Sequence, residues 1–166
     1  MRDLISHFIY YRFSRNWSYV FVSGFLLFLT VFIQILTGVF IACKLNNYFN
    51  VLQVIHSITA SLIIILLYTH IYKSLYYRVD LGSHERYSFI TGVVVFLFIF
   101  LVAFSGYVIP WGQMSFWGTK VITNYLDLLP IFGTRIKEGI WGSDFMSESI
   151  TRPRFLSLHI ILGCFL

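Results

Sequence analysis

The chain has 166 residues, of which 58% are hydrophobic and only 11% are charged, and its mean hydropathy is +0.78. These values lie far outside the range of soluble globular domains and predict a protein with several membrane spans. The formal net charge of +5 does not indicate nucleic-acid binding, because the basic residues flank apolar runs. The two isolated cysteines predict neither a disulfide nor an iron–sulfur site.

Three uncharged runs are long enough to cross a hydrocarbon core, which takes about 20 residues. We expect spans at about residues 17–43, 51–72 and 87–110. A fourth apolar run, residues 155–166, is too short to span alone, so we expect the chain to be cut within its fourth helix. The segment before the first span, which shows no cleavable signal peptide, is expected to lie on the membrane surface. The sequence thus predicts an all-α, polytopic membrane protein, a four-helix bundle with a truncated fourth helix.

The segment between the third and fourth runs, residues 111–154, predicts helices on the membrane surface. Pro110 is expected to end the third span, because proline lacks a backbone donor and clashes with the preceding turn. The stretch QMSFWGTKVITNYL that follows is apolar at roughly helical spacing. A second short helix is expected near Thr134, with Lys137 and Glu138 as solvated charges without a chemical role.

Two histidines lie inside the second run, which carries no formal charge. His56 and His70 are fourteen residues apart, and in a helix this interval rises ~21 Å and completes almost a whole number of turns. Both imidazoles therefore point from one face, at two depths. Such a helix can offer an axial ligand to each of two stacked cofactors, although a lone intramembrane histidine can equally be a hydrogen-bonded core residue.

Glycines repeat the same interval in the two neighbouring runs. Gly24 and Gly38 are fourteen residues apart, as are Gly92 and Gly106. Glycine costs a helix roughly 1 kcal/mol relative to alanine, so paired glycines predict two places where something flat approaches the backbone. The alternative is that these glycines only let membrane helices pack closely.

The expected topology assigns these residues to two levels. Arginine and lysine gather before the first span and after the second, which places both segments on the inner side and residues 111–154 on the outer side. The outer level is then His56, His159, Gly38 and Gly106, and the inner level is His70, Gly24 and Gly92. A second inner ligand is expected one fourteen-residue step beyond His159, from another polypeptide or from a portion of the gene product outside this chain.

The segment GYVIPWGQMSFWGTKVITN, residues 106–124, closely resembles the signature of the cytochrome b family, the membrane haem subunits of quinol:cytochrome c reductase, respiratory complex III. QILTG at residues 34–38, the histidine pair, and RFLSLH at residues 154–159 are similar as well. The resemblance covers nearly the whole chain and corresponds to the first three spans and the beginning of the fourth.

The resemblance implies two b-type haems packed on the four glycines. It implies outer haem iron bound by His56 and His159, and inner haem iron bound by His70 and a histidine outside this chain. Lys73 and Arg154 stand where contacts with haem or its propionates are implied. The implied outer pocket for ubiquinol includes Phe104, Tyr107, Met114 and Gly118. No side chain of this chain is required as a nucleophile.

The same resemblance implies a subunit of quinol:cytochrome c oxidoreductase in the mitochondrial inner membrane, which couples quinol oxidation on the outer side to quinone reduction on the inner side and to proton translocation. The implied partners are the remaining part of cytochrome b, a Rieske iron–sulfur protein, a cytochrome c1-type subunit and membrane lipids, in a dimeric complex without nucleic acid. The chain is not expected to be active alone.

Three positions depart from the family pattern. Gln53 stands where an arginine is usual, so the usual cationic partner of an outer haem propionate is absent or replaced. Lys73 replaces an arginine and keeps a point charge without the bidentate fork. Thr119 stands where alanine is common, which bears on inhibitor fit. The plastid relative is disfavoured, because residues 20–23 contain no cysteine for attaching an extra haem.

Other functions remain open from the residues alone. A haem-bearing membrane anchor of another respiratory dehydrogenase would also use bis-histidine haems, but would have no need of the PWGQMSFWG segment. A non-haem scaffold or transporter would use the histidines in a proton path, as intramembrane ionisable residues often are used. A nonfunctional truncated product is the remaining possibility.

Overall fold

The computed structural model describes residues 19–43, 49–77 and 85–166, and helices are the only regular elements in these ranges. This confirms the all-α prediction. In chain order the elements are α2 (Tyr19–Ala42), α3 (Phe49–Tyr76), α4 (Glu85–Val108), α5 (Gln113–Asn124), the 3₁₀-helix η2 (Tyr125–Leu128), α6 (Gly133–Trp141) and α7 (Glu148–Cys164). The expected surface segment before the first span lies outside the described residues.

Three of these helices are long and apolar enough to cross a membrane. The qualifying stretches are Val22–Ala42, Asn50–Tyr76 and Arg86–Val108, with 21, 27 and 23 residues. Even the shortest rises about 31 Å, which matches a hydrocarbon core of about 30 Å. Their outward faces carry exposed apolar side chains such as Phe28 and Val94. In a bilayer such side chains face lipid at no cost.

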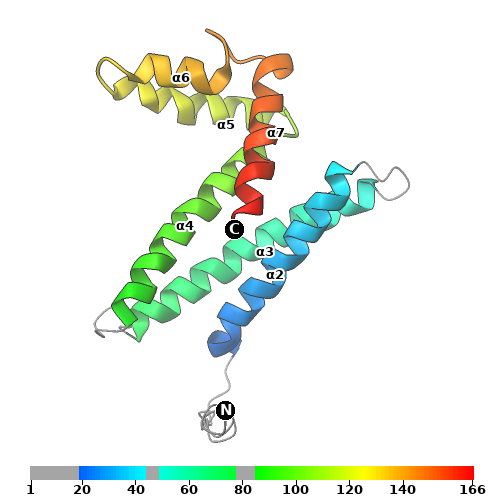
Figure 1. Cartoon of the computed structure of the whole chain (residues 1–166), viewed down its shortest axis with the longest axis vertical. Helices are drawn as coiled ribbons and strands as arrows, with labels where there is room; N and C mark the ends of the chain where they lie inside the picture. The colour runs from blue at the N-terminus through cyan, green and yellow to red at the C-terminus, as the bar shows by residue number, and fades with distance from the viewer. Residues whose placement is uncertain (1–18, 44–48, 78–84) are drawn as a thin grey trace, which may run out of the picture.

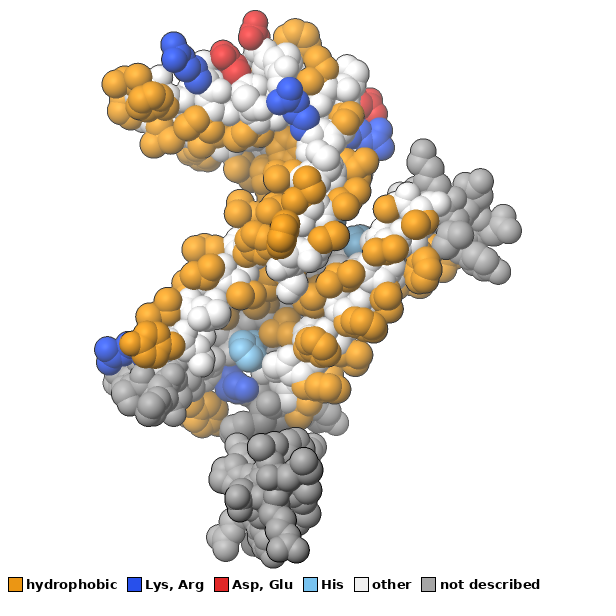
Figure 2. Space-filling view, viewed as in Figure 1, with side chains coloured by type: hydrophobic (Ala, Val, Ile, Leu, Met, Phe, Trp, Pro, Cys, Tyr) orange, Lys and Arg blue, Asp and Glu red, His pale blue; other side chains and the backbone are white. Residues whose placement is uncertain are grey.

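The helices form two antiparallel pairs, α2 with α3 and α4 with α7, which lean against each other (Figure 1). A small apolar core joins them: Ile63 and Leu67 of α3 are buried with Ile99 of α4, and Leu27 and Val31 of α2 pack against this cluster. Helices α5 and α6 form a layer across one end of the α4–α7 pair (Figure 1). The acidic side chains visible in Figure 2 lie at that end, whereas the long helices present mainly hydrophobic side chains.

Helix α7 begins at Glu148, seven residues before the expected start of the fourth run, and it contains Pro153. Two local interactions stabilise this early start. The backbone N–H of Ser147 donates to the Thr151 hydroxyl (3.2 Å), and Arg152 pairs with Glu148 one turn earlier (2.8 Å). Glu148 also lies in the first turn, where a negative charge favours the helix dipole. The helix therefore runs from the surface layer into the core of the molecule.

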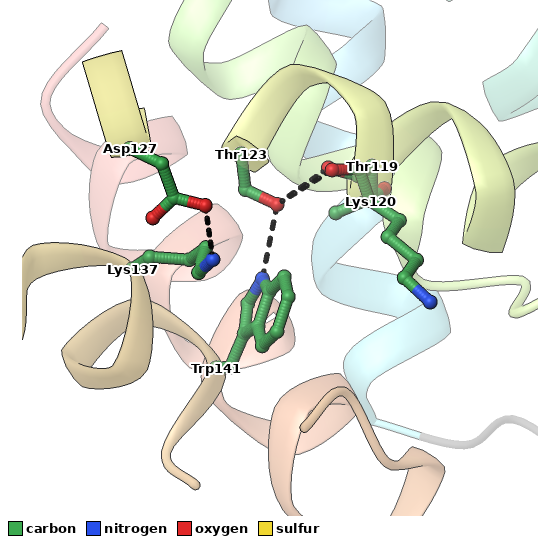
Figure 3. A network of polar contacts seen from close by, with 6 residues as sticks. All are labelled: Thr119, Lys120, Thr123, Asp127, Lys137 and Trp141. Carbon is green, nitrogen blue, oxygen red and sulfur yellow. Dashed lines mark hydrogen bonds and ion pairs between the residues drawn. The ribbon is translucent and has the colours of Figure 1, made fainter. Parts of the chain in front are cut away.

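A chain of buried hydrogen bonds fastens α5, α6 and α7 together. The indole N–H of Trp141 donates to the Thr123 hydroxyl (3.0 Å), which itself donates to the carbonyl of Thr119 (2.7 Å) (Figure 3). From α7, the Thr151 hydroxyl donates to the carbonyl of Trp141 (2.9 Å). These four side chains are 4% exposed or less. Every polar group in this cluster has a hydrogen-bond partner, so its burial does not cost stability. The cluster therefore stabilises the layer formed by α5 and α6.

Lys137 is not the solvated charge that the sequence suggested. Its ammonium group forms an ion pair with Asp127 of η2, and it also lies 5.2 Å from the centre of the Trp141 ring (Figure 3). The turn between η2 and α6 folds back so that the two charges meet. Lys137 therefore covers the buried indole and helps close the layer.

We predict that Trp141→Phe lowers the free energy of unfolding of the surface layer by about 1–3 kcal/mol, because a buried hydrogen bond and part of a packed ring are lost. Thermal unfolding of the detergent-solubilised native assembly measures this change. The matched control is Trp117→Phe in α5, since Trp117 is 55% exposed and its indole donates only to Gln113. Equal losses in both variants would contradict the assignment.

Candidate functional site

Two histidines from different helices face each other between the helix pairs. The ring centres of His56 in α3 and His159 in α7 lie 6.3 Å apart, and the ring planes are inclined at 79°. Both imidazoles are half-buried. The two rings therefore flank a small volume between the helix pairs, and they belong to the two histidines expected together at the outer level.

The hydrogen bonds of His56 determine which of its nitrogens is free. The Thr37 hydroxyl lies 2.9 Å from Nδ1 and is also 2.9 Å from the carbonyl of Ile33, to which it donates its proton. With that proton on the backbone carbonyl, the Thr37 oxygen accepts a hydrogen bond from Nδ1–H of His56. We assign this tautomer to His56, and it leaves the lone pair on Nε2.

His159 has the same tautomer. Its Nδ1 lies 2.9 Å from the carbonyl of Val102, which can only accept a hydrogen bond. The Ser105 hydroxyl is 3.3 Å from the same nitrogen and donates to the same carbonyl (2.8 Å). Nδ1 of His159 is thus also protonated, and its Nε2 is free to bind a metal.

The spacing of the rings fits one metal ion between two axial imidazoles. Two metal–nitrogen bonds of roughly 2.0–2.1 Å plus about 1 Å from each nitrogen to its ring centre add up to nearly the observed 6.3 Å. Among the described residues, no group of three or more His, Cys, Asp or Glu side chains could enclose a metal. A metal held here would therefore take its other donors from a non-protein ligand, as iron does in haem.

Glycine residues make room for the imidazoles. A Cβ atom at Gly38 would lie 3.4 Å from Cε1 of His56, and one at Gly106 would lie 2.7 Å from Cε1 of His159. At Gly106 no larger residue fits unless the His159 ring or α7 moves. The flat groups against these two glycines are thus the histidine rings themselves, which accounts for the fourteen-residue interval shared by glycines and histidines.

His70, the histidine expected at the inner level, lies against a serine and a glycine of α2. His70 of α3 lies with Nδ1 3.3 Å from the Ser23 hydroxyl, and a Cβ atom at Gly24 would lie 3.2 Å from its Cε1. Nothing lies within 4 Å of a Cβ built on Gly92. The described residues contain only three histidines, and the other two occupy the outer level. His70 and His56 share α3, which contains neither glycine nor proline.

The remaining predicted residues fall into separate places. A Cβ atom at Gly118 would lie 3.4 Å from the Tyr107 ring, so these two residues are in contact range. Phe104 packs edge-on against Phe155 of α7, with ring centres 5.9 Å apart. Met114 of α5 is 83% exposed. The structure therefore brings Tyr107 and Gly118 together, whereas Phe104 packs on the helix that carries His159.

The two basic residues expected near a cofactor also lie apart. Arg154 donates from Nη1 to the carbonyl of Gly139 (2.7 Å), which ties its guanidinium to α6. Lys73 is half-buried on α3, three residues after His70. Lys73 therefore shares the level of His70, whereas Arg154 joins the surface layer to α7.

The hydroxyl groups that contact the imidazoles were not among the residues predicted from the sequence. Ser23, Thr37 and Ser105 are all buried, and each directly precedes one of the glycines already singled out. The sequence feature that could have identified them is a polar side chain inside an apolar run. A buried hydroxyl needs a hydrogen-bond partner, and here the partner is a histidine of the facing helix.

We predict that Gly106→Ala lowers the free energy of unfolding by about 1–3 kcal/mol, because the added methyl group forces the His159 ring or α7 to move. Gly139→Ala is the control, since no atom lies within 4 Å of its Cβ position. Replacing glycine in a helix by alanine otherwise stabilises by up to about 1 kcal/mol. Thermal unfolding compares the two variants, and a Gly106→Ala chain as stable as Gly139→Ala would refute the close packing.

Known proteins resemble this chain over most of its length. The family model described as cytochrome b/b6/petB matches residues 43–166. Curated relatives include proteins named cytochrome b from Solanum tuberosum (38% identical), Chondrus crispus (36%) and Rickettsia bellii (35%). The alignments cover 96%, 97% and 96% of this chain, and 44%, 47% and 44% of the respective relatives. The chain thus spans less than half the length of the curated relatives it matches.

Proposed function

Because the chain belongs to the cytochrome b/b6 family, we propose that it is the N-terminal part of a cytochrome b that carries electrons across a membrane between two b-type haems. The observation that supports this most is the His56–His159 pair, with both Nε2 lone pairs free and ring centres 6.3 Å apart. His56 and His159 would hold the outer haem iron. His70 would hold the inner one, together with a histidine from outside this chain.

The chain's residues favour electron transfer over ligand binding. A haem with two imidazole ligands has no open coordination position, so it supplies one-electron transfer and not oxygen binding. Around the imidazoles, α2, α3 and α4 provide apolar side chains and hydroxyls, and no formally charged residue lies between His56 and His70. This surrounding keeps water away and lets the few hydrogen bonds set the redox potentials.

We further propose that the outer level serves quinol oxidation and the inner level quinone reduction, within a quinol:cytochrome c oxidoreductase of the mitochondrial inner membrane. Tyr107 and Gly118 lie in contact range beside the turn from α4 to α5, and would form part of a pocket for ubiquinol. The partners would be the remaining part of cytochrome b, a Rieske iron–sulfur protein, a cytochrome c1-type subunit and lipids, in a dimeric complex. The chain would not turn over quinol by itself.

The first test is haem stoichiometry. We expect a reduced-minus-oxidised spectrum of the native assembly to show two b-type haems per copy of this chain. Quantifying every polypeptide in the same sample should reveal a companion histidine-containing segment at equal stoichiometry. A complete absence of haem would exclude electron transfer and favour a non-haem scaffold.

The second test separates the two levels. His56→Ala should remove the outer haem and abolish quinol oxidation, because His159 alone cannot provide both axial bonds. His70→Ala should instead remove the inner haem and leave the outer spectrum intact. The amount of chain in the membrane serves as the control for both variants. A His56→Ala chain that retains both haems with normal spectra would overturn the assignment.

A further inference from the structure

The hydroxyl residues that touch the imidazoles share one sequence context. Of the 11 glycines in the chain, only four directly follow a serine or threonine, and these are the four that form the fourteen-residue pairs. The four dipeptides are Ser23–Gly24, Thr37–Gly38, Thr91–Gly92 and Ser105–Gly106. The fourteen-residue interval and the preceding serine or threonine thus mark the same four glycines. We therefore treat each hydroxyl residue and the glycine after it as one structural unit.

Three of these units each hold an imidazole from a facing helix. The distances from the hydroxyl oxygens of Ser23, Thr37 and Ser105 to the nearest imidazole Nδ1 are 3.3, 2.9 and 3.3 Å. The three hydroxyl residues are 2%, 7% and 0% exposed. A hydrogen bond at such sites is shielded from water, and the low local dielectric strengthens it.

The fourth unit has the same construction without an imidazole among the described residues. The Thr91 hydroxyl donates to the carbonyl of Tyr87 (2.9 Å), one turn earlier, as the Thr37 hydroxyl donates to Ile33. The hydroxyl oxygen of Thr91 can therefore still accept a hydrogen bond. Thr91 is exposed, and the space beside Gly92 is open within 4 Å. This unit lies fourteen residues before Ser105–Gly106 on α4, at the level of His70.

We propose that the four hydroxyls are positioning residues for axial imidazoles. Each contacts Nδ1 of a histidine on a facing helix and accepts a hydrogen bond from it, at His159 together with the Val102 carbonyl, and Thr91 does so for the histidine that completes the inner level. This inference rests on the proposed haem-binding function and adds the groups that orient its ligands. A hydrogen bond from Nδ1–H raises the basicity of the imidazole and fixes its orientation. A more basic imidazole stabilises ferric over ferrous iron, so each hydroxyl lowers the midpoint potential of its haem.

The test compares Thr37→Val with Thr91→Val in the native assembly. Valine keeps the shape of threonine but removes the hydrogen-bond acceptor. We expect Thr37→Val to raise the midpoint potential of the outer haem alone and Thr91→Val that of the inner haem alone. We expect the ferric-to-ferrous ratio at a fixed potential to change by up to tenfold, which corresponds to a shift of the midpoint potential of up to about 59 mV for a one-electron couple. The g values of each low-spin ferric haem should change with the potential, because they depend on imidazole orientation.

Thr30 provides a matched control on α2. Like Thr37 it is 7% exposed and donates to carbonyls three and four residues earlier, but no bond from its hydroxyl to an imidazole is found among the described residues. Thr30→Val should therefore leave both potentials and both sets of g values unchanged. Thr37→Ser retains the hydroxyl and should restore the outer potential, even if Thr37→Val loses its haem.

The outcomes separate this inference from the proposed function. One outcome is that all three variants, Thr37→Val, Thr91→Val and Thr30→Val, keep haems with bis-histidine spectra and the same potentials and g values. This result would overturn the positioning role and leave the proposed function intact. A shift of the outer haem in Thr91→Val would also contradict the assignment of levels. A native assembly without haem would overturn both proposals.

Discussion

The fit of imidazole rings against glycine backbone is the constraint on which the arrangement of the long helices depends. His56 closes the gap between α3 and α2 at Gly38, and His159 closes the gap between α7 and α4 at Gly106. A side chain at Gly106 would force the His159 ring or α7 to move, since its Cβ would lie 2.7 Å from the ring. The helix pairs thus owe their spacing to the groups that would bind the metal, and structure and chemistry are specified by the same contacts.

The surface layer follows a different principle, because it relies on buried polar contacts where the long helices rely on apolar ones. Trp141 and the threonines around it connect α5, α6 and α7 through hydrogen bonds that are all satisfied. Arg154 adds a bond from α7 to the α6 carbonyl of Gly139. The layer thereby holds the start of α7 in place, and α7 carries His159 from there into the membrane part of the molecule.

Much of this could be predicted from the sequence, because the informative signals are periodic. Apolar runs of span length, and the fourteen-residue interval of His56, His70 and the glycines, follow directly from helix geometry. The pairing of Lys137 with Asp127 could not be predicted, because it depends on how the turn between η2 and α6 folds back. The early start of α7 depends on the hydrogen bond between Ser147 and Thr151, a local preference that hydrophobicity does not reveal.

The absence of glycine and proline from α3 has a consequence for the proposed electron transfer. Glycines that admit the imidazoles all lie on α2 and α4, so the helix that carries both His56 and His70 is continuous between them. The separation of the two ligands is then set by the covalent geometry of one helix, at 1.5 Å per residue. Neighbouring helices can repack without altering it. For the proposed function, the distance between the two ligands of α3 is therefore fixed by that helix.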